Sequence, residues 1–201
     1  MKHSITKATD RQIKANLKSW INTASIQNEN DGREWYSEAQ AFTRKLAKTY
    51  GIDSYVVASV ISALSPNNKW ERNKVDAVAV IEAFNAGLTA DDVKVCTYTA
   101  NKEKAFAILS GKVEIVSKSP KTHAFAMNVG LLSSSHITID KWMVRAALLR
   151  PNKVEEVVES ISPANYRRVE RIAATLASNE GVKGFQLQAI IWVSIKDNWG
   201  R

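Results

Sequence analysis

Apolar residues recur every three or four positions along most of this chain, which places them on one face of a helix. The first stripe follows a capping box from Thr9 to Gln12, a pattern typical of a helix start. The segment 56–64 is apolar on all sides, which indicates a helix at the centre of the core. Stripes and capping signals together predict helices at residues 10–24, 35–50, 54–64, 69–86, 99–109, 120–130, 141–149, 163–176 and 185–199.

The segments between these helices are polar or contain glycine and proline. The run QNENDG at residues 27–32 predicts a break between two helices. At most a brief extended segment is expected, near residues 113–116. We therefore expect an all-α protein that forms a single compact unit over residues 1–201, with lobes at 1–55 plus 151–201 and at 56–150.

Composition narrows the class of protein. The 201 residues carry a formal net charge of +8, which suits a polyanionic partner. The single cysteine, Cys96, excludes an internal disulfide framework and any four-cysteine metal site. No apolar run reaches the roughly 18 residues of a membrane span, and the N-terminus does not resemble a signal peptide. We expect a cytoplasmic protein without a membrane partner.

Two ionisable residues, Lys121 and Asp140, each stand at a predicted helix start. Ser119 and Pro120 suit the cap and first position of one helix, and Asp140 precedes the helix KWMVRAALL. The partial positive charge of a helix start favours an anionic carboxylate and disfavours a protonated amine. Two interpretations of each residue stay open: Asp140 is a catalytic carboxylate or only an N-cap, and Lys121 is a nucleophile or a phosphate contact.

The stretch 117–145, SKSPKTHAFAMNVGLLSSSHITIDKWMVR, resembles the core of the helix-hairpin-helix DNA glycosylases, the endonuclease III and 8-oxoguanine glycosylase superfamily. PKTHAFAMNV is similar to the family's lysine-bearing helix, and ITIDKWMVRAA to its turn that carries the catalytic aspartate. The resemblance implies a two-lobed helical fold with a cleft between the lobes, and it implies Asp140 and Lys121 as the catalytic residues. This chain departs from the family at the hairpin, where Ser117 and Ser119 replace the usual glycines.

Two further segments are similar to parts of the same family. ISALSPNNKWERNK resembles the loop that fills the hole left by a flipped base, which implies that role for Asn67 and Asn68. Their alternative interpretation is as ordinary turn and cap residues. QAIIW in the last helix resembles a segment whose glutamine reads the flipped base and whose aromatic residue stacks on it. Gln188 and Trp192 are therefore base-pocket candidates, and Trp192 is alternatively a core residue.

The remaining candidates are contacts to the DNA backbone or to the base. Lysines and helix starts are common anchors for phosphate groups. Trp142 either lines the base pocket or packs in the core. The expected DNA contacts, besides Asn67 and Asn68, are Ser117, Lys118, Ser119, Lys141 and Arg145.

Taken together, the resemblance implies a monomeric DNA glycosylase for base excision, which flips a damaged or modified base from double-stranded DNA and cleaves its N-glycosidic bond. If Lys121 attacks the sugar, a Schiff base forms and AP-lyase activity follows, whereas attack by water leaves an abasic site. Some small members of the superfamily are antiviral and remove glucosylated hydroxymethylcytosine from phage DNA. That base and an oxidised base are the expected substrates.

No cofactor and no metal ion is expected for the chemistry, because the histidines are scattered and no ligand cluster occurs. Two other classes of function stay open. One is a non-catalytic helix-hairpin-helix module that binds DNA without releasing a base. The other is a helical interaction protein with no role at nucleic acids.

Overall fold

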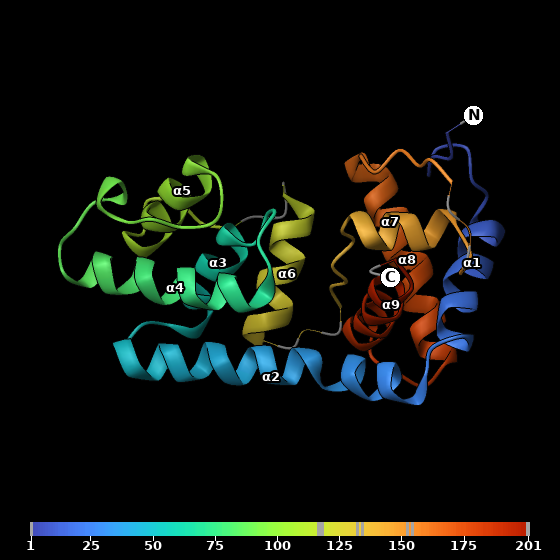
Figure 1. The fold of residues 1–201 in the computed structure, drawn as a ribbon, viewed down its shortest axis with the longest axis horizontal. Coiled ribbons are helices and arrows are strands. Elements are labelled where there is room, and N and C mark those ends of the chain that lie inside the picture. The colour runs from blue at the N-terminus through green and yellow to red at the C-terminus, as the bar shows by residue number, and fades with distance from the viewer. Residues whose placement is uncertain are drawn as a thin grey trace. The chain divides into compact units, whose positions relative to one another are not determined.

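The computed structural model describes residues 2–115, 119–131, 133, 135–151, 153 and 155–199, and its regular elements are helices (Figure 1). The pairing of extended backbone within these residues is limited to an isolated bridge between His3 and Val157. The expectation of an all-α protein is confirmed. The elements are α1 (Asp10–Asn22), α2 (Ile26–Tyr50), α3 (Ser54–Leu64), α4 (Trp70–Asn85), the 3-10 turn η1 (Ala90–Asp92), α5 (Thr99–Leu109), α6 (Pro120–Leu131), α7 (Lys141–Leu148), α8 (Pro163–Asn179) and α9 (Gly184–Trp199).

The helix starts follow the capping signals of the sequence. Thr9 and Gln12 form the expected capping box of α1, and the Asp53 carboxylate accepts hydrogen bonds from two backbone N–H groups of α3. Asp140 and Ser162 cap α7 and α8 in the same way. These interactions join residues two or three positions apart, so the local sequence suffices to predict them.

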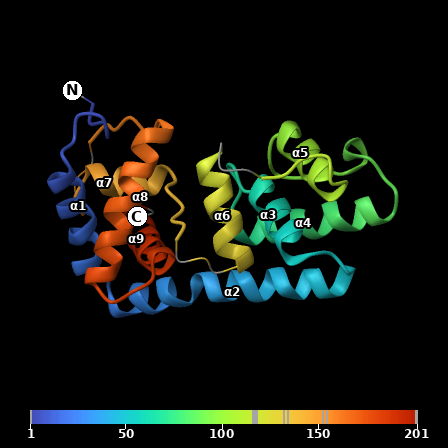
Figure 2. The ribbon, with the colours of Figure 1, turned by 180° about the vertical axis from the view of Figure 1, so that it is seen from behind.

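The expected break at residues 27–32 is wrong, because α2 runs without interruption from Ile26 to Tyr50 (Figure 2). Most of the polar run faces solvent as one side of the helix. Its side chains pair at the helical spacing of four residues: Gln27 donates to Asp31 at 2.6 Å, and Arg33 forms an ion pair with Glu29 at 2.6 Å. A polar run of this length is therefore compatible with an exposed helical turn.

Gly32 sits inside α2 because α9 approaches it closely. A Cβ atom at this position would lie 2.5 Å from the backbone N and Cα atoms of Ile190. Glycine is otherwise unfavourable in the middle of a helix by about 1 kcal/mol. The contact with α9 explains why glycine occurs here without ending the helix.

The chain divides into two compact units. Unit 1 comprises Met1–Glu38 and Leu132–Arg201, and unit 2 comprises Ala39–Leu131. The division falls inside α2, so that helix contributes residues to both units. These boundaries differ from those of the expected lobes, 1–55 plus 151–201 and 56–150.

Unit 1 is built around α1, which packs against α7, α8 and α9. Its core contains the predicted stripe Ile13, Leu17 and Trp20, all at most 1% exposed. The Trp20 indole also donates a hydrogen bond of 2.7 Å to the Leu149 carbonyl. This bond ties α1 to the residue that follows α7.

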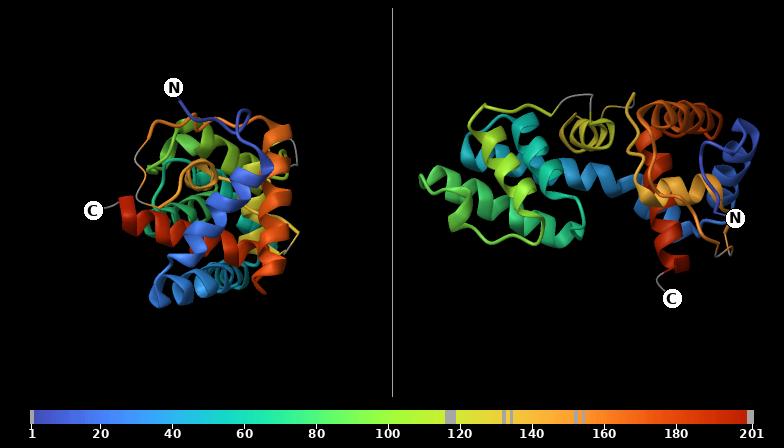
Figure 3. Two further views of the ribbon diagram at one scale, coloured as in Figure 1. Left: turned by 90° about the vertical axis from the view of Figure 1, so that its right-hand side faces the viewer. Right: turned by 90° about the horizontal axis from the view of Figure 1, so that it is seen from above.

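Unit 2 is built around α3, which packs against α4, α5 and α6 (Figure 3). Every residue of α3 from Val57 to Leu64 is buried, as the apolar segment predicts. None of the helices in the described part of the chain is long and apolar enough to cross a membrane.

Candidate functional site

Asp140 lies in unit 1 where the segment 137–139 meets α7. Its carboxylate accepts a 2.9 Å hydrogen bond from the Met143 N–H and so caps α7. The hydroxyl of Tyr166 holds the preceding segment, because it donates to the Ile137 carbonyl at 2.8 Å and accepts from the Ile139 N–H at 3.0 Å. Both isoleucines are at most 1% exposed. The backbone leading to the carboxylate is therefore anchored in the core.

Tyr36 of α2 connects this turn with α9. Its hydroxyl donates to Gln188 Oε1 at 2.7 Å and lies 3.4 Å from Thr138 Oγ1. All three residues are buried. Burial raises the pKa of the Tyr36 hydroxyl, and the negative charge of Asp140 adds to that rise. One predicted site residue, Gln188, thus binds this buried hydroxyl directly, and the hydroxyl also reaches Thr138 in the turn that leads to Asp140.

Aromatic side chains continue from Tyr36 to Trp192. The Trp35 ring is edge-on to Tyr36 at 4.7 Å between ring centroids and to Trp192 at 5.6 Å. The Lys196 Nζ lies 3.6 Å from the Trp192 ring centroid, a distance at which a cation is attracted to the ring face. Trp192 is only partly buried, so it is not simply a residue of the interior.

The start of α7 presents a group of cations around Trp142. The Lys141 Nζ lies 5.4 Å and the Arg145 Cζ 4.9 Å from the centroid of this ring. Arg145 also forms an ion pair with Glu159. The positive charge of Arg145 is therefore already compensated in part by a carboxylate, whereas Lys141 is exposed.

The two asparagines of the α3–α4 loop, in unit 2, have different environments. Asn67 is exposed and has a φ of 57°, a left-handed conformation that asparagine tolerates better than most residues. Its side-chain amide donates to the Tyr98 hydroxyl. Asn68 instead turns inward, and its Nδ2 donates to Asp76 Oδ2 at 2.8 Å. Of the two, only Asn67 stands at the surface of the loop.

The Asp76 carboxylate holds the base of this loop. It is 1% exposed and accepts hydrogen bonds from Asn68, from the Cys96 N–H at 2.9 Å and from Arg72 Nε at 3.0 Å. Three donors to one buried carboxylate compensate for its removal from water. Asp76 therefore joins the α3–α4 loop, α4 and the segment before α5.

Lys121 lies in the first turn of α6, also in unit 2. Its side chain is exposed and makes no hydrogen bond or ion pair with another residue that the structure describes. Ser119 stands directly before the helix, and its carbonyl accepts from the His123 N–H at 2.9 Å. Ser117 and Lys118 lie outside the described residues. Because Lys121 and Asp140 belong to different units, the shared cleft expected for them stays a prediction.

Several of the long-range contacts described above carried no signal in the sequence. Tyr36 and Gln188 are 152 positions apart, and no local pattern connects them. Tyr166 lies in the apolar stripe of α8, where its hydroxyl is not distinguishable from a packing role. Asp76 follows the helical pattern of α4 and looks like an ordinary solvent-facing residue.

No group of three or more His, Cys, Asp or Glu side chains within the described ranges could hold a metal ion. The candidate site thus consists of a capping carboxylate, a buried amide and hydroxyl, partly exposed aromatic rings and nearby lysines. Such a set can stabilise positive charge, and its partly exposed aromatic rings can stack on another flat ring.

Residues 1–199 match a family of unknown function, DUF7178. The chain belongs to this family. Comparisons with curated proteins and with solved structures give no match. Membership of the family assigns no activity, so the function is argued from the residues of the site.

Proposed function

We propose that this protein is a DNA glycosylase of the helix-hairpin-helix class, which flips a modified or damaged base from double-stranded DNA and cleaves its N-glycosidic bond. The observation that carries the proposal is the turn at residues 137–140. A segment held by Tyr166 leads to a carboxylate at a helix start, and Tyr36 connects the same turn with Gln188. This arrangement supports the sequence resemblance, in which the aspartate and the glutamine belong to one site.

In the proposed reaction Asp140 acts in its ionised form. As the N-glycosidic bond breaks, the bonding electrons leave with the base and positive charge develops on the deoxyribose. A carboxylate held rigidly beside the sugar stabilises this charge without having to reorient. Either the Lys121 amine or a water molecule then bonds to C1′ and loses a proton, and the departing base anion gains one. The amine leads to a Schiff base and strand cleavage, and water leaves an abasic site.

Gln188 and the aromatic residues would receive the extruded base. An amide can donate and accept hydrogen bonds at a base edge, and an aromatic face can stack on a base. Gln188 accepts a hydrogen bond from Tyr36 through Oε1, and this bond orients the amide. Asn67, at the exposed surface of its loop, would fill the space in the duplex, while Asn68 has the structural role of binding Asp76.

Binding of the duplex is proposed to rest on phosphate contacts by lysines at helix starts. Lys121 and Lys141 are both exposed in the first turns of α6 and α7. With a net charge of +8, the protein should lose duplex affinity steeply as salt increases, because phosphate contacts release counterions. Affinity that does not change between two ionic strengths would contradict this part of the proposal.

The central experiment incubates the protein with a panel of DNAs and identifies released bases by mass spectrometry. The panel includes phage DNA with glucosylated hydroxymethylcytosine, DNA with oxidised bases and unmodified cellular DNA. Asp140→Asn should reduce base release by about 100-fold, on the order of 3 kcal/mol of barrier, with duplex binding retained. Asparagine is also a good N-cap, so the substitution removes the charge while the start of α7 is kept.

Asp53→Asn is the matched control, because Asp53 caps α3 in the same way that Asp140 caps α7. This variant should release the base at the wild-type rate. Equal losses in the two variants would indicate a folding effect and contradict the catalytic role of Asp140. Duplex binding with no base released from any substrate of the panel would favour the non-catalytic module instead.

The role of Lys121 is tested by trapping with borohydride, which reduces a Schiff base to a stable protein–DNA adduct. If Lys121 is the nucleophile, Lys121→Gln should abolish the adduct, whereas Lys45→Gln, which removes the same charge from an exposed site of α2, should leave it unchanged. Wild-type protein that releases a base and never forms an adduct would show that water is the attacking group.

A further inference from the structure

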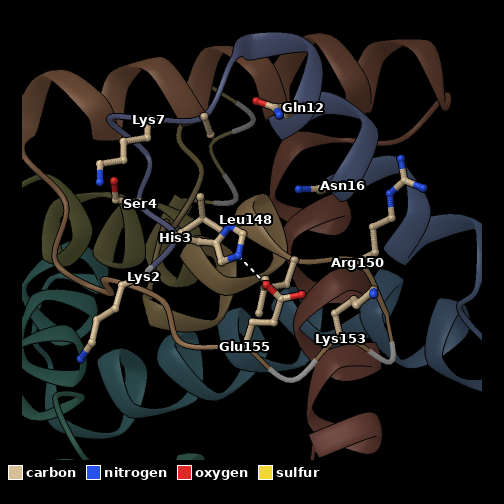
Figure 4. A pocket seen from close by; sticks show the side chains of 12 residues that line it. Lys2, His3, Ser4, Lys7, Gln12, Asn16, Leu148, Arg150, Lys153 and Glu155 are labelled. Carbon is tan, nitrogen blue, oxygen red and sulfur yellow. Dashed lines mark hydrogen bonds and ion pairs between the residues drawn. The ribbon is translucent and has the colours of Figure 1, made fainter.

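A cavity of about 500 Å³ lies in unit 1, apart from the residues of the proposed catalytic site (Figure 4). Its walls come from the N-terminal segment, α1, the end of α7 and the segment that follows α7. The N-terminal wall is held in place by backbone hydrogen bonds, from the His3 N–H to the Glu156 carbonyl at 3.0 Å and from the Val158 N–H to the His3 carbonyl at 2.8 Å. A volume of this size is typical of sites for small organic ligands.

The lining of the cavity carries more positive than negative charge. Four lysine or arginine residues line it against one carboxylate, whereas the whole chain has 28 basic and 20 acidic residues. The carboxylate, Glu155, is bound to His3, and Lys2 forms an ion pair with Glu156 at 3.4 Å. Lys7, Arg150 and Lys153 form no ion pair with another described residue, and set against the Glu155 carboxylate they leave the lining with an excess of positive charge.

These cations surround the cavity. In Figure 4, Arg150 and Lys153 lie on one side of the His3–Glu155 pair, and Lys7 lies on the other. A concave wall with an excess of positive charge concentrates the electric field, so an anion inside it is attracted more strongly than at a flat surface. Arginine and lysine together suit a phosphate group, because arginine can bind two of its oxygens at once.

The rest of the lining suits an uncharged polar body attached to such a phosphate. Leu148 and Leu149 provide an apolar portion. Two side-chain amides can each offer one more group to a ligand. Asn16 donates through Nδ2 to the Ala147 carbonyl, so its Oδ1 can accept a hydrogen bond. Gln12 accepts through Oε1 from the Thr9 N–H, so its NH₂ group can donate one. An apolar surface with a donor and an acceptor at its edge is what a heterocyclic ring requires.

We infer that this cavity binds a small phosphorylated molecule with a polar ring, of the nucleotide class, independently of the proposed glycosylase site. A nucleic-acid backbone would offer the same phosphate chemistry. The volume of the cavity and the amides of Gln12 and Asn16 favour a compact ligand that contains a ring, because the backbone of a duplex offers phosphate groups alone.

Calorimetric titration of the full chain with ADP, inorganic pyrophosphate and adenosine at low ionic strength tests this inference. ADP should bind, pyrophosphate more weakly, and adenosine weakest. The double variant Arg150→Gln/Lys153→Gln should raise the Kd for ADP at least about tenfold, since each lost charge-assisted contact weakens binding substantially. Both residues are exposed, so the substitutions should leave the fold intact.

The matched control is Lys14→Gln/Lys45→Gln, which removes two exposed charges outside the cavity and should leave the Kd within twofold. Absence of binding by both ADP and pyrophosphate would overturn the inference, as would an equal loss in the control variant. Displacement of ADP by a duplex oligonucleotide, with the same loss of duplex affinity in the cavity variant, would assign the cavity to DNA and also overturn it. Base release is measured in parallel, and its failure in wild-type protein would concern only the proposed glycosylase.

Discussion

Replacement of Tyr166 by phenylalanine tests how the turn that bears Asp140 is held. The substitution removes one oxygen atom and leaves the ring, so it opens no large cavity. It does remove the partner of two backbone groups, the Ile137 carbonyl and the Ile139 N–H, in a region that is at most 1% exposed. Each buried group left without a partner costs about 1 to 3 kcal/mol, so the variant should lose about 2 to 6 kcal/mol of stability. That is a large part of the roughly 5 to 15 kcal/mol that stabilises a typical domain.

Equilibrium urea unfolding followed by circular dichroism measures this loss, and hydrogen exchange of the Ile139 amide reports it locally. Exchange at that amide should accelerate strongly in the variant. Tyr50→Phe is the control, because the Tyr50 hydroxyl donates to Glu82 in an exposed position, and its removal should change stability by less than about 0.5 kcal/mol. A Tyr166→Phe variant as stable as wild type, with unchanged exchange at Ile139, would refute the argument that this hydroxyl anchors the turn.

Three further predictions concern stability. Burial raises the pKa of both Tyr36 and Tyr166 above the value of about 10 in an unfolded chain. The stability that depends on these two neutral hydroxyls should therefore be fully present below pH 10 and be lost as pH rises above it. A double phenylalanine variant should lack this alkaline loss when urea unfolding is measured at several pH values. Gly32→Ala should lower the midpoint of urea unfolding despite alanine's higher helix propensity, because the new methyl group would clash with the Ile190 backbone. An unchanged or raised midpoint would contradict that close contact. Hydrogen bonds from Arg168, which has the larger effect, and from Arg171 lower the pKa of the Asp10 carboxyl. Asp10→Asn should therefore be less stable than wild type at pH 7, and the difference in stability should shrink as pH falls below about 4. A difference in stability that does not depend on pH would exclude the ion pairs as its cause.

The local sequence determined most helix starts and ends. A cap such as Thr9, Asp53 or Asp140 binds an N–H group two or three residues away, so the whole interaction is contained in a few positions of the chain. The burial of α3 also followed directly from the sequence, because a helix without a polar face has no side that can remain in water. Because capping interactions span only a few positions of the chain, the sequence alone could also identify Asp140 and Lys121 as residues at helix starts.

The tertiary structure decided what the local pattern could not contain. The polar run at residues 27–32 lies within α2, and Gly32 in this run lets the Ile190 backbone approach the helix. Ile190 is far away in the sequence, so no local pattern could predict this contact. The hydroxyl of Tyr36 reaches Gln188 across 152 positions. Hydrogen bonds of this kind arise only when packing removes both groups from water, since exposed side chains would bind solvent instead. The positions of Asp140 and Lys121 at helix starts could be predicted from the sequence, whereas the buried hydrogen bonds of Tyr36 and Tyr166 arise only from the fold.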